Sequence, residues 1–440
     1  MDLRFQNECN HRRVLCNRIV LFSCLETQFG NRLASRRTMK PIRVALLTHE
    51  PFYPPSGGGS AEAIYLVEEL VRRGHEVHIF CPKLAAPDLV QQKFKVHLHE
   101  FTTWEMGRYT KLRNFKYLLY PSFLQRMVER AAKEIKFDAV LSQHAIAAVA
   151  AGGLKKSLGV PVFMNFLDYL TAFMETWPPY LAPRPIIATL KNFELKLPLR
   201  NHADGVLTVS DTLAELFAKT GYPREQILPI YYGYDSEIFK FQEGVQRGSG
   251  KPSVVAMHGS LDFHHVGNIA FEAVAEIFKL RPETVFRFVG HRTAALEKLL
   301  NRAKAEIPQA KIESTGFVSY ADVPKHLESA SVGIIPYEES IGTHCAFAAK
   351  PVEYSALGIP VVSTPLKSVQ GYFRDVPLVR FSQFDGADFG KTVVSWFDES
   401  PENISAWGKE ASARVKADLD WRSISRKAID FLEKILSEKK

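Results

Sequence analysis

After the first forty residues, hydrophobic positions follow a repeating order of strand and helix patterns. Residues 42–50, IRVALLTHE, form an apolar run typical of a buried strand, and residues 51–60 are rich in glycine and proline. Residues 61–74 carry apolar side chains at helical spacing and end in Gly74, a favourable helix C-cap, and a second strand is predicted at 75–82. This order predicts parallel strands joined by a right-handed crossover.

The same pattern continues and then starts again near residue 252. Further strands are predicted in the first half at 138–143, 160–166 and 204–210. In the second half, strands are predicted at 252–260, 284–290, 311–318, 331–337 and 359–365, and helices at 270–282, 293–307, 321–330 and from Ala348. We therefore predict an α/β protein with two doubly wound, Rossmann-like domains, at 39–238 and 239–418, that face each other across a cleft. Ligands of such sheets bind at the carboxyl ends of the strands.

Length and composition agree with this prediction and exclude several protein classes. A chain of 440 residues suits two domains, and 46% hydrophobic with 24% charged residues is typical of a globular enzyme. The net charge of +8 is too small in either half to indicate a nucleic-acid-binding protein. No apolar run reaches the length of a membrane-spanning helix. The five cysteines form no C-x-x-C pair, which argues for a reducing compartment and against disulfides or structural zinc.

The first 38 residues have no helical or alternating pattern, although they are rich in arginine. An organelle-targeting segment is one interpretation, but acidic residues are present and serine is sparse, which disfavours it. A natural start at Met39 would explain the change of pattern. We therefore expect residues 1–38 to be a disordered or spurious N-terminal extension without function.

Three motifs, taken in order along the chain, resemble glycosyltransferase family 4, the group 1 enzymes of the GT-B fold. They are ADGVLTVS at 203–210, YGYDSEIF at 232–239 and KPVEYSALGIPVVST at 350–364. The resemblance extends from Ile42 to the last helix. It implies a retaining, hexosyltransferase-type enzyme that uses a nucleotide sugar bound on the C-terminal domain and a hydroxyl acceptor bound on the N-terminal domain. It also implies that residues 419–440 form a helix that crosses back to the N-terminal domain.

Two polar residues in the third motif are the main candidates for donor binding. Glu353 lies one turn into an otherwise apolar helix, where a carboxylate can accept hydrogen bonds from two ribose hydroxyls, and the resembled family uses this glutamate in that way. Lys350 lies on roughly the same helix face and can neutralise a diphosphate leaving group. The alternatives are a solvated glutamate and a lysine that only pairs with it. The apolar neighbours favour the binding role, because an unpaired buried carboxylate is costly.

The loop at 338–347, EESIGTHCAF, leads into that helix and can present free backbone N–H groups to a phosphate. The residues that we expect to do so are Gly342, Thr343 and His344. The family has a second acidic residue eight positions before Glu353, and this chain has Cys345 there. The group that contacts the transferred sugar is therefore expected to be absent or relocated, and Glu338 or Glu339 is an open guess for its replacement.

The cationic residues that bind the diphosphate in the family are also replaced. Ser260 and His265 occupy the positions of the usual arginine and lysine after the first strand of the C-terminal domain. A histidine supplies positive charge only when it is protonated, and a plain surface histidine is an equal alternative. Arg292, after the strand that ends at Gly290, is another expected phosphate contact.

The remaining expected contacts come from both domains. The resemblance implies that the nucleobase contacts the backbone and surface of Phe317 and Val318. Glycines allow close approach to a diphosphate or sugar after the first strand, at Gly57, Gly58 and Gly59. His144 and Asp168 follow strands, so we expect them to contact or deprotonate the acceptor, with capping or packing as the alternative for each.

These residues predict the partners as well. We expect a nucleotide-sugar donor, no metal, no other cofactor and no nucleic acid. Residues 101–136 mix basic and aromatic side chains, which suggests a peripheral contact with the inner membrane surface and a lipid-linked acceptor, although a helix packed on its own sheet is the alternative. The predicted function is sugar transfer in the cytoplasm for polysaccharide or glycoconjugate synthesis. A catalytically silent GT-B protein or a sugar-nucleotide epimerase is the rival prediction.

Overall fold

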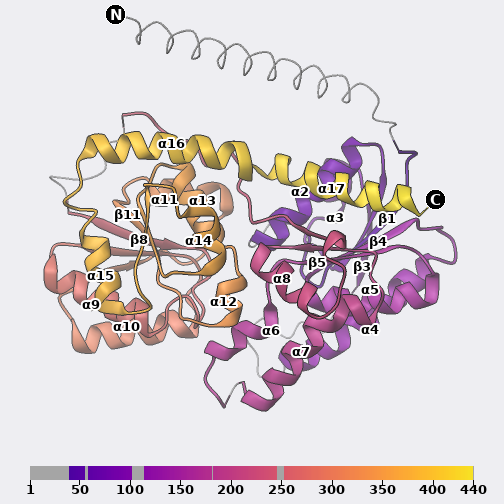
Figure 1. The fold of residues 1–440 in the computed structure, drawn as a ribbon, viewed down its shortest axis with the longest axis horizontal. Coiled ribbons are helices and arrows are strands. Elements are labelled where there is room, and N and C mark those ends of the chain that lie inside the picture. Colours follow the sequence, from indigo (N-terminus) through magenta and orange to yellow (C-terminus); the bar gives the residue numbers. More distant parts are fainter. Residues whose placement is uncertain (1–38, 55–57, 102–112, 181, 245–251, 440) are drawn as a thin grey trace, which may run out of the picture. The chain divides into compact units, whose positions relative to one another are not determined.

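The computed structural model describes residues 39–54, 58–101, 113–180, 182–244 and 252–439. Within these residues the chain forms two parallel β-sheets with helices on both faces (Figure 1). The first sheet has seven strands in the order β3-β2-β1-β4-β5-β6-β7. Their bounds are β1 (Arg43–Leu47), β2 (Glu76–Pro82), β3 (His97–Phe101), β4 (Ala139–Gln143), β5 (Val162–Phe166), β6 (Gly205–Thr208) and β7 (Ile227–Pro229).

The second sheet repeats this winding with six strands in the order β10-β9-β8-β11-β12-β13. Their bounds are β8 (Val254–His258), β9 (Val285–Val289), β10 (Lys311–Ser314), β11 (Val332–Ile335), β12 (Val361–Ser363) and β13 (Val379–Phe381). Central strands such as β4, β5 and β11 are buried at every residue, because helices cover both faces. These continuous apolar runs are the strands that the sequence predicts.

Helices of the first half connect its strands. They are α2 (Gly58–Arg72), α3 (Pro87–Phe94), α4 (Arg113–Ala131), α5 (His144–Leu158), α6 (Leu170–Phe173), η1 (Met174–Thr176), α7 (Arg184–Arg200), α8 (Asp211–Lys219) and η2 (Arg224–Gln226). Helix α2 ends as expected: Gly74 has a φ of 86°, and the N–H groups of Gly74 and His75 bond to the carbonyls of the last turn.

Helices of the second half likewise connect its strands, and two long helices follow the last strand. They are α9 (Asn268–Leu280), α10 (Ala294–Glu306), η3 (Tyr320–Asp322), α11 (Val323–Leu327), α12 (Ile341–Cys345), α13 (Ala349–Ala356), α14 (Lys367–Phe373), α15 (Gly386–Val394), α16 (Pro401–Leu419) and α17 (Trp421–Glu438). In the described part of the chain, no helix combines the length and apolar character that crossing a membrane needs.

The chain passes between the two sheets twice, and the two passages are hydrogen-bonded to each other. The N–H of Tyr234 donates to the carbonyl of Leu419, and the N–H of Trp421 donates to the carbonyl of Tyr234. Beyond this bridge α17 packs against α2 of the first sheet, where the rings of Tyr65 and Trp421 stack and Arg73 pairs with Asp430 (Figure 1). The last helix thus belongs to the first half of the fold.

Candidate active site

Glu353 lies in α13 and is buried, with 4% of its surface exposed. Its carboxylate accepts a hydrogen bond from Nε2 of His258, the last residue of β8, and it also shares a hydrogen bond with the hydroxyl of Tyr320. Burial and the negative charge of Glu353 raise the pKa of Tyr320, so the hydroxyl stays protonated and donates. The carboxylate is therefore held at the carboxyl end of β8 and is not a solvated surface group.

Lys350, one turn earlier in α13, is also buried. Its Nζ donates to the hydroxyl of Tyr337 at 2.9 Å. Among the described residues no carboxylate oxygen lies within 4.0 Å of Nζ, so Lys350 forms no direct ion pair with Glu353. Burial lowers the pKa of Lys350 to about 8, against the opposing effect of the carboxylates of Glu353, Asp262 and Asp168.

The backbone of Gly259 passes close to Lys350. A Cβ atom at Gly259 would lie 3.6 Å from Nζ of Lys350, and this glycine has a φ of 85°. Such a backbone conformation is rare for residues with side chains. Glycine is therefore favoured at the end of β8 by its backbone conformation, and it adds no side chain next to the ammonium group.

The histidines after β8 lie beside Lys350, and both are uncharged at neutral pH. Burial, together with the charge of Lys350, lowers the pKa of His264 to about 3 and that of His265 well below its usual value. His265 Nδ1 accepts from the N–H of Asp262, and its ring meets Tyr337 edge-on. His264 stacks on Phe173 of α6, and its buried Nδ1 has no hydrogen-bond partner among the described residues.

The loop residues before α13 make several contacts of their own. Thr343 is fully buried and forms a capping box with Ser340. Gly342 lies against the backbone of α6, since a Cβ there would be 2.6 Å from N of Phe173. His344 approaches Glu339 at 3.3 Å, and the buried Cys345 accepts a hydrogen bond from Ser210 through its carbonyl. A phosphate contact of Gly342, Thr343 or His344 stays a prediction.

Four other predicted donor contacts lie nearer the surface. Ser260 is exposed and bonds to Asp262. Arg292 is exposed and forms an ion pair with Glu297 at 2.7 Å. Phe317 is 57% exposed and stacks on the ring of His291 at 4.6 Å, and Val318 is half-buried beside it. An exposed aromatic pair of this kind offers a flat surface to a nucleobase.

Asp168 follows β5 of the first sheet, and its carboxyl group interacts electrostatically with Lys350. Burial, with the negative charges of Glu194 and Glu50, raises its pKa to about 8, while the charge of Lys350 opposes this rise. Asp168 is therefore protonated at neutral pH and can donate a hydrogen bond. The structure thus relates one predicted acceptor-side residue to the predicted donor-side lysine.

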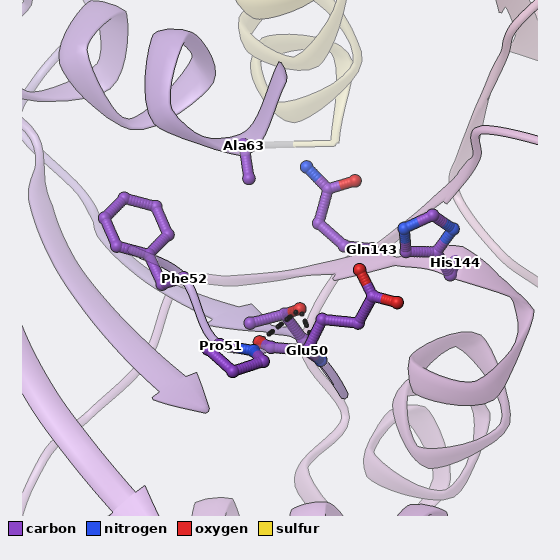
Figure 2. Close-up of a pocket in the computed structure, with 7 residues that line it drawn as sticks. Glu50, Pro51, Phe52, Ala63, Gln143 and His144 are labelled. Carbon is purple, nitrogen blue, oxygen red and sulfur yellow. Dashed lines mark hydrogen bonds between the residues drawn. The ribbon is translucent and has the colours of Figure 1, made fainter. Parts of the chain in front are cut away.

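His144, the other predicted acceptor-side residue, lines a small separate pocket with Glu50, Phe52 and Gln143 (Figure 2). It begins α5 with a φ of 66°, and its ring meets that of His49 edge-on at 5.2 Å. Figure 2 shows the carboxyl group of Glu50 next to the ring of His144, while the amide of Gln143 points away from Glu50. Burial lowers the pKa of His144, so the imidazole is uncharged there.

A buried polar network beside this pocket was not predicted. Nδ2 of Asn165 in β5 donates to the carboxyl group of Glu62 in α2 and to Oε1 of Gln143 at 2.8 Å. Burial raises the pKa of Glu62 to about 8. The sequence signal that could have indicated this network is the presence of Glu62 and Asn165 as polar residues next to apolar ones.

Of the predicted glycine loop, Gly57 lies outside the described residues, and Gly58 and Gly59 begin α2. Of the predicted membrane segment, residues 102–112 lie outside them, whereas α4 is described. Helix α4 buries Tyr120, Leu124 and Val128 and exposes Leu119 and Phe123. It therefore packs on its own domain and still presents apolar side chains outward.

Comparison with known proteins shows the family of the chain. Residues 56–238 match the model for Glycosyltransferase Family 4, and residues 252–382 match that for Glycosyl transferases group 1, which together span more than half of the chain. Over 188 residues the chain is 26% identical to the Bacillus subtilis (strain 168) protein named "Putative teichuronic acid biosynthesis glycosyltransferase TuaH". That match covers 41% of this chain and 44% of the relative, and so less than half of its length.

Solved structures show the same architecture. HepE from Anabaena, solved with UDP and glucose, matches with a TM-score of 0.66 at 16% identity, over 89% of this chain and 99% of that one. Sucrose-phosphate synthase from Thermosynechococcus elongatus matches with a TM-score of 0.75 at 13% identity, over 90% and 100%. At such identities the likeness concerns the fold. Both domains match family models and the architecture is shared, so the chain belongs to the group 1 glycosyltransferases of the GT-B fold.

Proposed function

We propose that this glycosyltransferase is a retaining, hexosyltransferase-type enzyme that moves a sugar from a nucleotide-sugar donor to a hydroxyl acceptor. The observation that carries the proposal is a buried ammonium group and a buried imidazole nitrogen that both have unused hydrogen-bonding capacity. An ammonium group has three N–H donors, and within the described residues the ammonium of Lys350 donates one hydrogen bond, to Tyr337. His264 Nδ1 lacks a partner among the described residues. Buried donors are normally satisfied, so an anionic ligand such as a diphosphate is the partner that they lack.

The chemistry follows from the charges at neutral pH. Lys350 is mostly protonated below about pH 8 and would stabilise the negative charge that develops on the leaving diphosphate. The two neutral imidazoles next to it, His264 and His265, can add hydrogen bonds but no net charge. This site therefore offers less positive charge than the arginine and lysine that the resembled family uses.

On the acceptor side, Asp168 is protonated below about pH 8. It would therefore hold an acceptor hydroxyl by hydrogen bonding and would not remove its proton. A retaining transfer without a protein nucleophile lets the leaving phosphate accept that proton. We infer this route because Asp168, the predicted acceptor base, is itself protonated at neutral pH.

Glu353 is the proposed ribose contact, and His258 and Tyr320 hold its carboxylate in place. A carboxylate has about four lone-pair sites, so two donors leave room for ribose hydroxyls. Hydrogen bonds to a charged group contribute about 1.5–3 kcal/mol, which corresponds to about 10- to 150-fold in affinity. Glu353→Gln should therefore weaken nucleotide binding by that factor.

The test begins with a thermal-shift screen of the full chain against UDP-, GDP-, ADP- and dTDP-sugars. Calorimetric titration of the best ligand then compares the wild type, Glu353→Gln and Glu313→Gln. Glu313 is an exposed glutamate of the same domain, paired with Arg287, and its substitution should leave binding unchanged. Binding without turnover would support a silent nucleotide-sugar-binding protein, which the loss of family residues at Ser260 and Cys345 favours as the second candidate. No binding of any nucleotide sugar would refute both.

We also propose a lipid-linked acceptor, peripheral attachment to the inner membrane surface and a cytoplasmic location, in polysaccharide or glycoconjugate synthesis, with a transfer reaction that requires no metal or other cofactor. Support comes from exposed apolar side chains on α4 and α7. Ile186, Leu190 and Phe193 follow one stripe of α7 and are 56%, 37% and 40% exposed. Lys196 and Arg200 lie next to this stripe, and Arg200 contacts the ring of Phe193. Such a surface suits an anionic bilayer.

Helices α4 and α7 both pack against α5, so their exposed apolar side chains lie on two helices that share a neighbour. A Cβ at Gly153 of α5 would meet Gln125 of α4, and a Cβ at Gly152 would meet Asn201 at the end of α7. The double substitution Ile186→Ser and Phe193→Ser should reduce co-sedimentation with phosphatidylglycerol vesicles. Leu280→Ser, at an exposed leucine of α9, is the control. Equal binding of all three proteins would contradict membrane attachment by this surface.

A further inference from the structure

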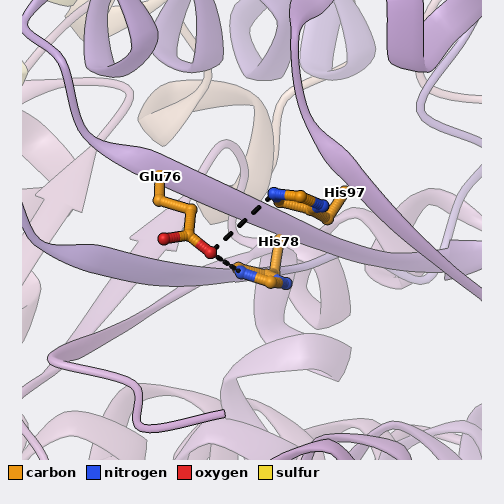
Figure 3. Close-up of side chains that lie close together, drawn as sticks. All are labelled: Glu76, His78 and His97. Carbon is orange, nitrogen blue, oxygen red and sulfur yellow. Dashed lines mark hydrogen bonds and ion pairs between the residues drawn. The ribbon is translucent and has the colours of Figure 1, made fainter.

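A cluster of metal-ligating side chains lies on the first sheet, away from the candidate active site. Glu76 and His78 belong to β2, and His97 and His99 belong to the neighbouring edge strand β3. His78 and His97 are register partners, so their side chains lie on the same face of the sheet. Figure 3 shows the side chains of Glu76, His78 and His97 converging. Glu76 is the first residue of β2, whereas the candidate active site lies at the carboxyl ends of the strands.

The three ligand atoms are close enough to share one ion. Oε1 of Glu76 is 2.9 Å from Nε2 of His78 and 3.8 Å from Nε2 of His97, and all three atoms lie within 4.8 Å of one another. Zinc bonds of about 2.0–2.2 Å in tetrahedral geometry place ligand atoms roughly 3.3–3.6 Å apart. The two distances to the carboxylate oxygen lie on either side of this range.

One side chain must turn to complete the geometry. The rings of His78 and His97 stack at 4.5 Å with an angle of 19°, so their lone pairs lie in nearly parallel planes and do not yet meet at one point. The side chain of His97 is 61% exposed and can rotate toward the ion, while His78 is 4% exposed and fixed. A fixed ligand and a mobile ligand on adjacent strands suit an open site that water completes.

The outer contacts hold the ligands in the orientation that a metal needs. Nδ1 of His78 lies 3.0 Å from Nε2 of His99, so His78 can donate through Nδ1 while Nε2 keeps a free lone pair for the metal. Arg43 donates to the other carboxylate oxygen of Glu76 at 2.8 Å and keeps Oε1 available. His99 in turn stacks on Phe80.

We propose that Glu76, His78 and His97 bind a divalent transition-metal ion, with zinc as the best fit. Two imidazoles and one carboxylate favour zinc, cobalt, nickel or copper over magnesium or calcium. The ion would join the edge strand β3 to β2 and so stabilise the border of the sheet. This site is separate from the proposed donor site, so its occupation and the transfer reaction are independent claims.

The test uses the full chain without an affinity tag, in reducing buffer, titrated with Zn²⁺ and Co²⁺. The matched variants are His97→Gln, at an exposed ligand, and His326→Gln, at a half-buried histidine of the second sheet's α11. We expect zinc to raise the melting temperature of the wild type and of His326→Gln, and His97→Gln to lose this rise with at least a tenfold loss of affinity. Equal melting temperatures without metal would show that His97→Gln folds normally.

Cobalt distinguishes this site from the cysteines of the sequence. Residues 1–38 contain three cysteines and one histidine, and thiolates bound to cobalt give an intense charge-transfer band that nitrogen and oxygen ligands do not. The proposal predicts a cobalt complex without that band, and its loss in His97→Gln. A thiolate band at the first equivalent, or equal zinc affinity in His97→Gln and the wild type, would overturn it. If the wild-type protein binds zinc as expected but transfers no sugar, only the proposed function is contradicted.

Discussion

Removing the hydroxyl of Tyr337 tests whether Lys350 works as the cation of the donor site. Its hydroxyl accepts the hydrogen bond from Lys350 Nζ at 2.9 Å, and both groups are buried. In Tyr337→Phe the ring remains and only this acceptor is lost. A hydrogen bond to a charged group contributes about 1.5–3 kcal/mol, and one pKa unit corresponds to 1.36 kcal/mol. The pKa of Lys350 should therefore fall by a further one to two units, roughly.

The consequence for binding can be calculated from the pKa of about 8 for Lys350 in the wild type. At pH 7 about nine-tenths of wild-type molecules carry the charge, and in the variant this share falls to between one-half and one-tenth, roughly. An anion that needs the ammonium should bind about 2- to 10-fold more weakly at pH 7. The loss should be smaller near pH 6, because more of the lysine is protonated there.

The assay is calorimetric titration with UDP, or with whichever nucleoside diphosphate the screen selects, from pH 5.5 to pH 9. Tyr222→Phe is the control, because it also loses a buried hydroxyl hydrogen bond of 2.9 Å, to the carbonyl of Ala203 just before β6 of the first sheet. The control should keep the wild-type pH dependence. If Tyr337→Phe also keeps it, Lys350 is not the group that binds the diphosphate.

Two other substitutions test the acceptor side and the contact between α12 and α6. The pKa of Asp168 is raised from 3.8 to about 8, so folding takes up a proton and stability falls as pH rises through that window. Asp168→Asn removes this loss, so its melting temperature relative to wild type should increase from pH 5 to pH 8 while sugar transfer decreases; a constant difference would refute the assignment. Gly342→Ala places a Cβ 2.6 Å from backbone N of Phe173 and should cost about 1–3 kcal/mol in urea unfolding. Gly371→Ala, with open space around its Cβ, should cost much less, and equal losses would contradict the close contact.

The central strands could be predicted because a parallel sheet covered on both faces leaves a continuous apolar run in the sequence. Edge strands leave no such run. Strand β3 reads HLHEF with most residues only half-buried, and no strand was predicted there. The cluster of Glu76, His78 and His97 was missed for the same reason, since it depends on the pairing of that strand with β2.

The candidate site was predicted in part, for an equally physical reason. Lys350 and Glu353 could be found because they are polar residues in an apolar helix. Their partners could not, because His258 lies 95 residues from Glu353 in the sequence and nothing local marks the contact. The Lys350–Glu353 ion pair that spacing allows was not formed, since Tyr337 takes the hydrogen bond of the lysine instead.

The packing of α17 on α2 has a consequence for the order in which the chain can fold. The first sheet completes its helical cover only with residues that are synthesised last, because Trp421 stacks on Tyr65 and Asp430 pairs with Arg73. While the ribosome still holds the C-terminus, the surface of α2 around Tyr65 lacks this cover. A chain made only up to α16 would therefore leave this surface of α2 uncovered, and so would a stop codon before α17.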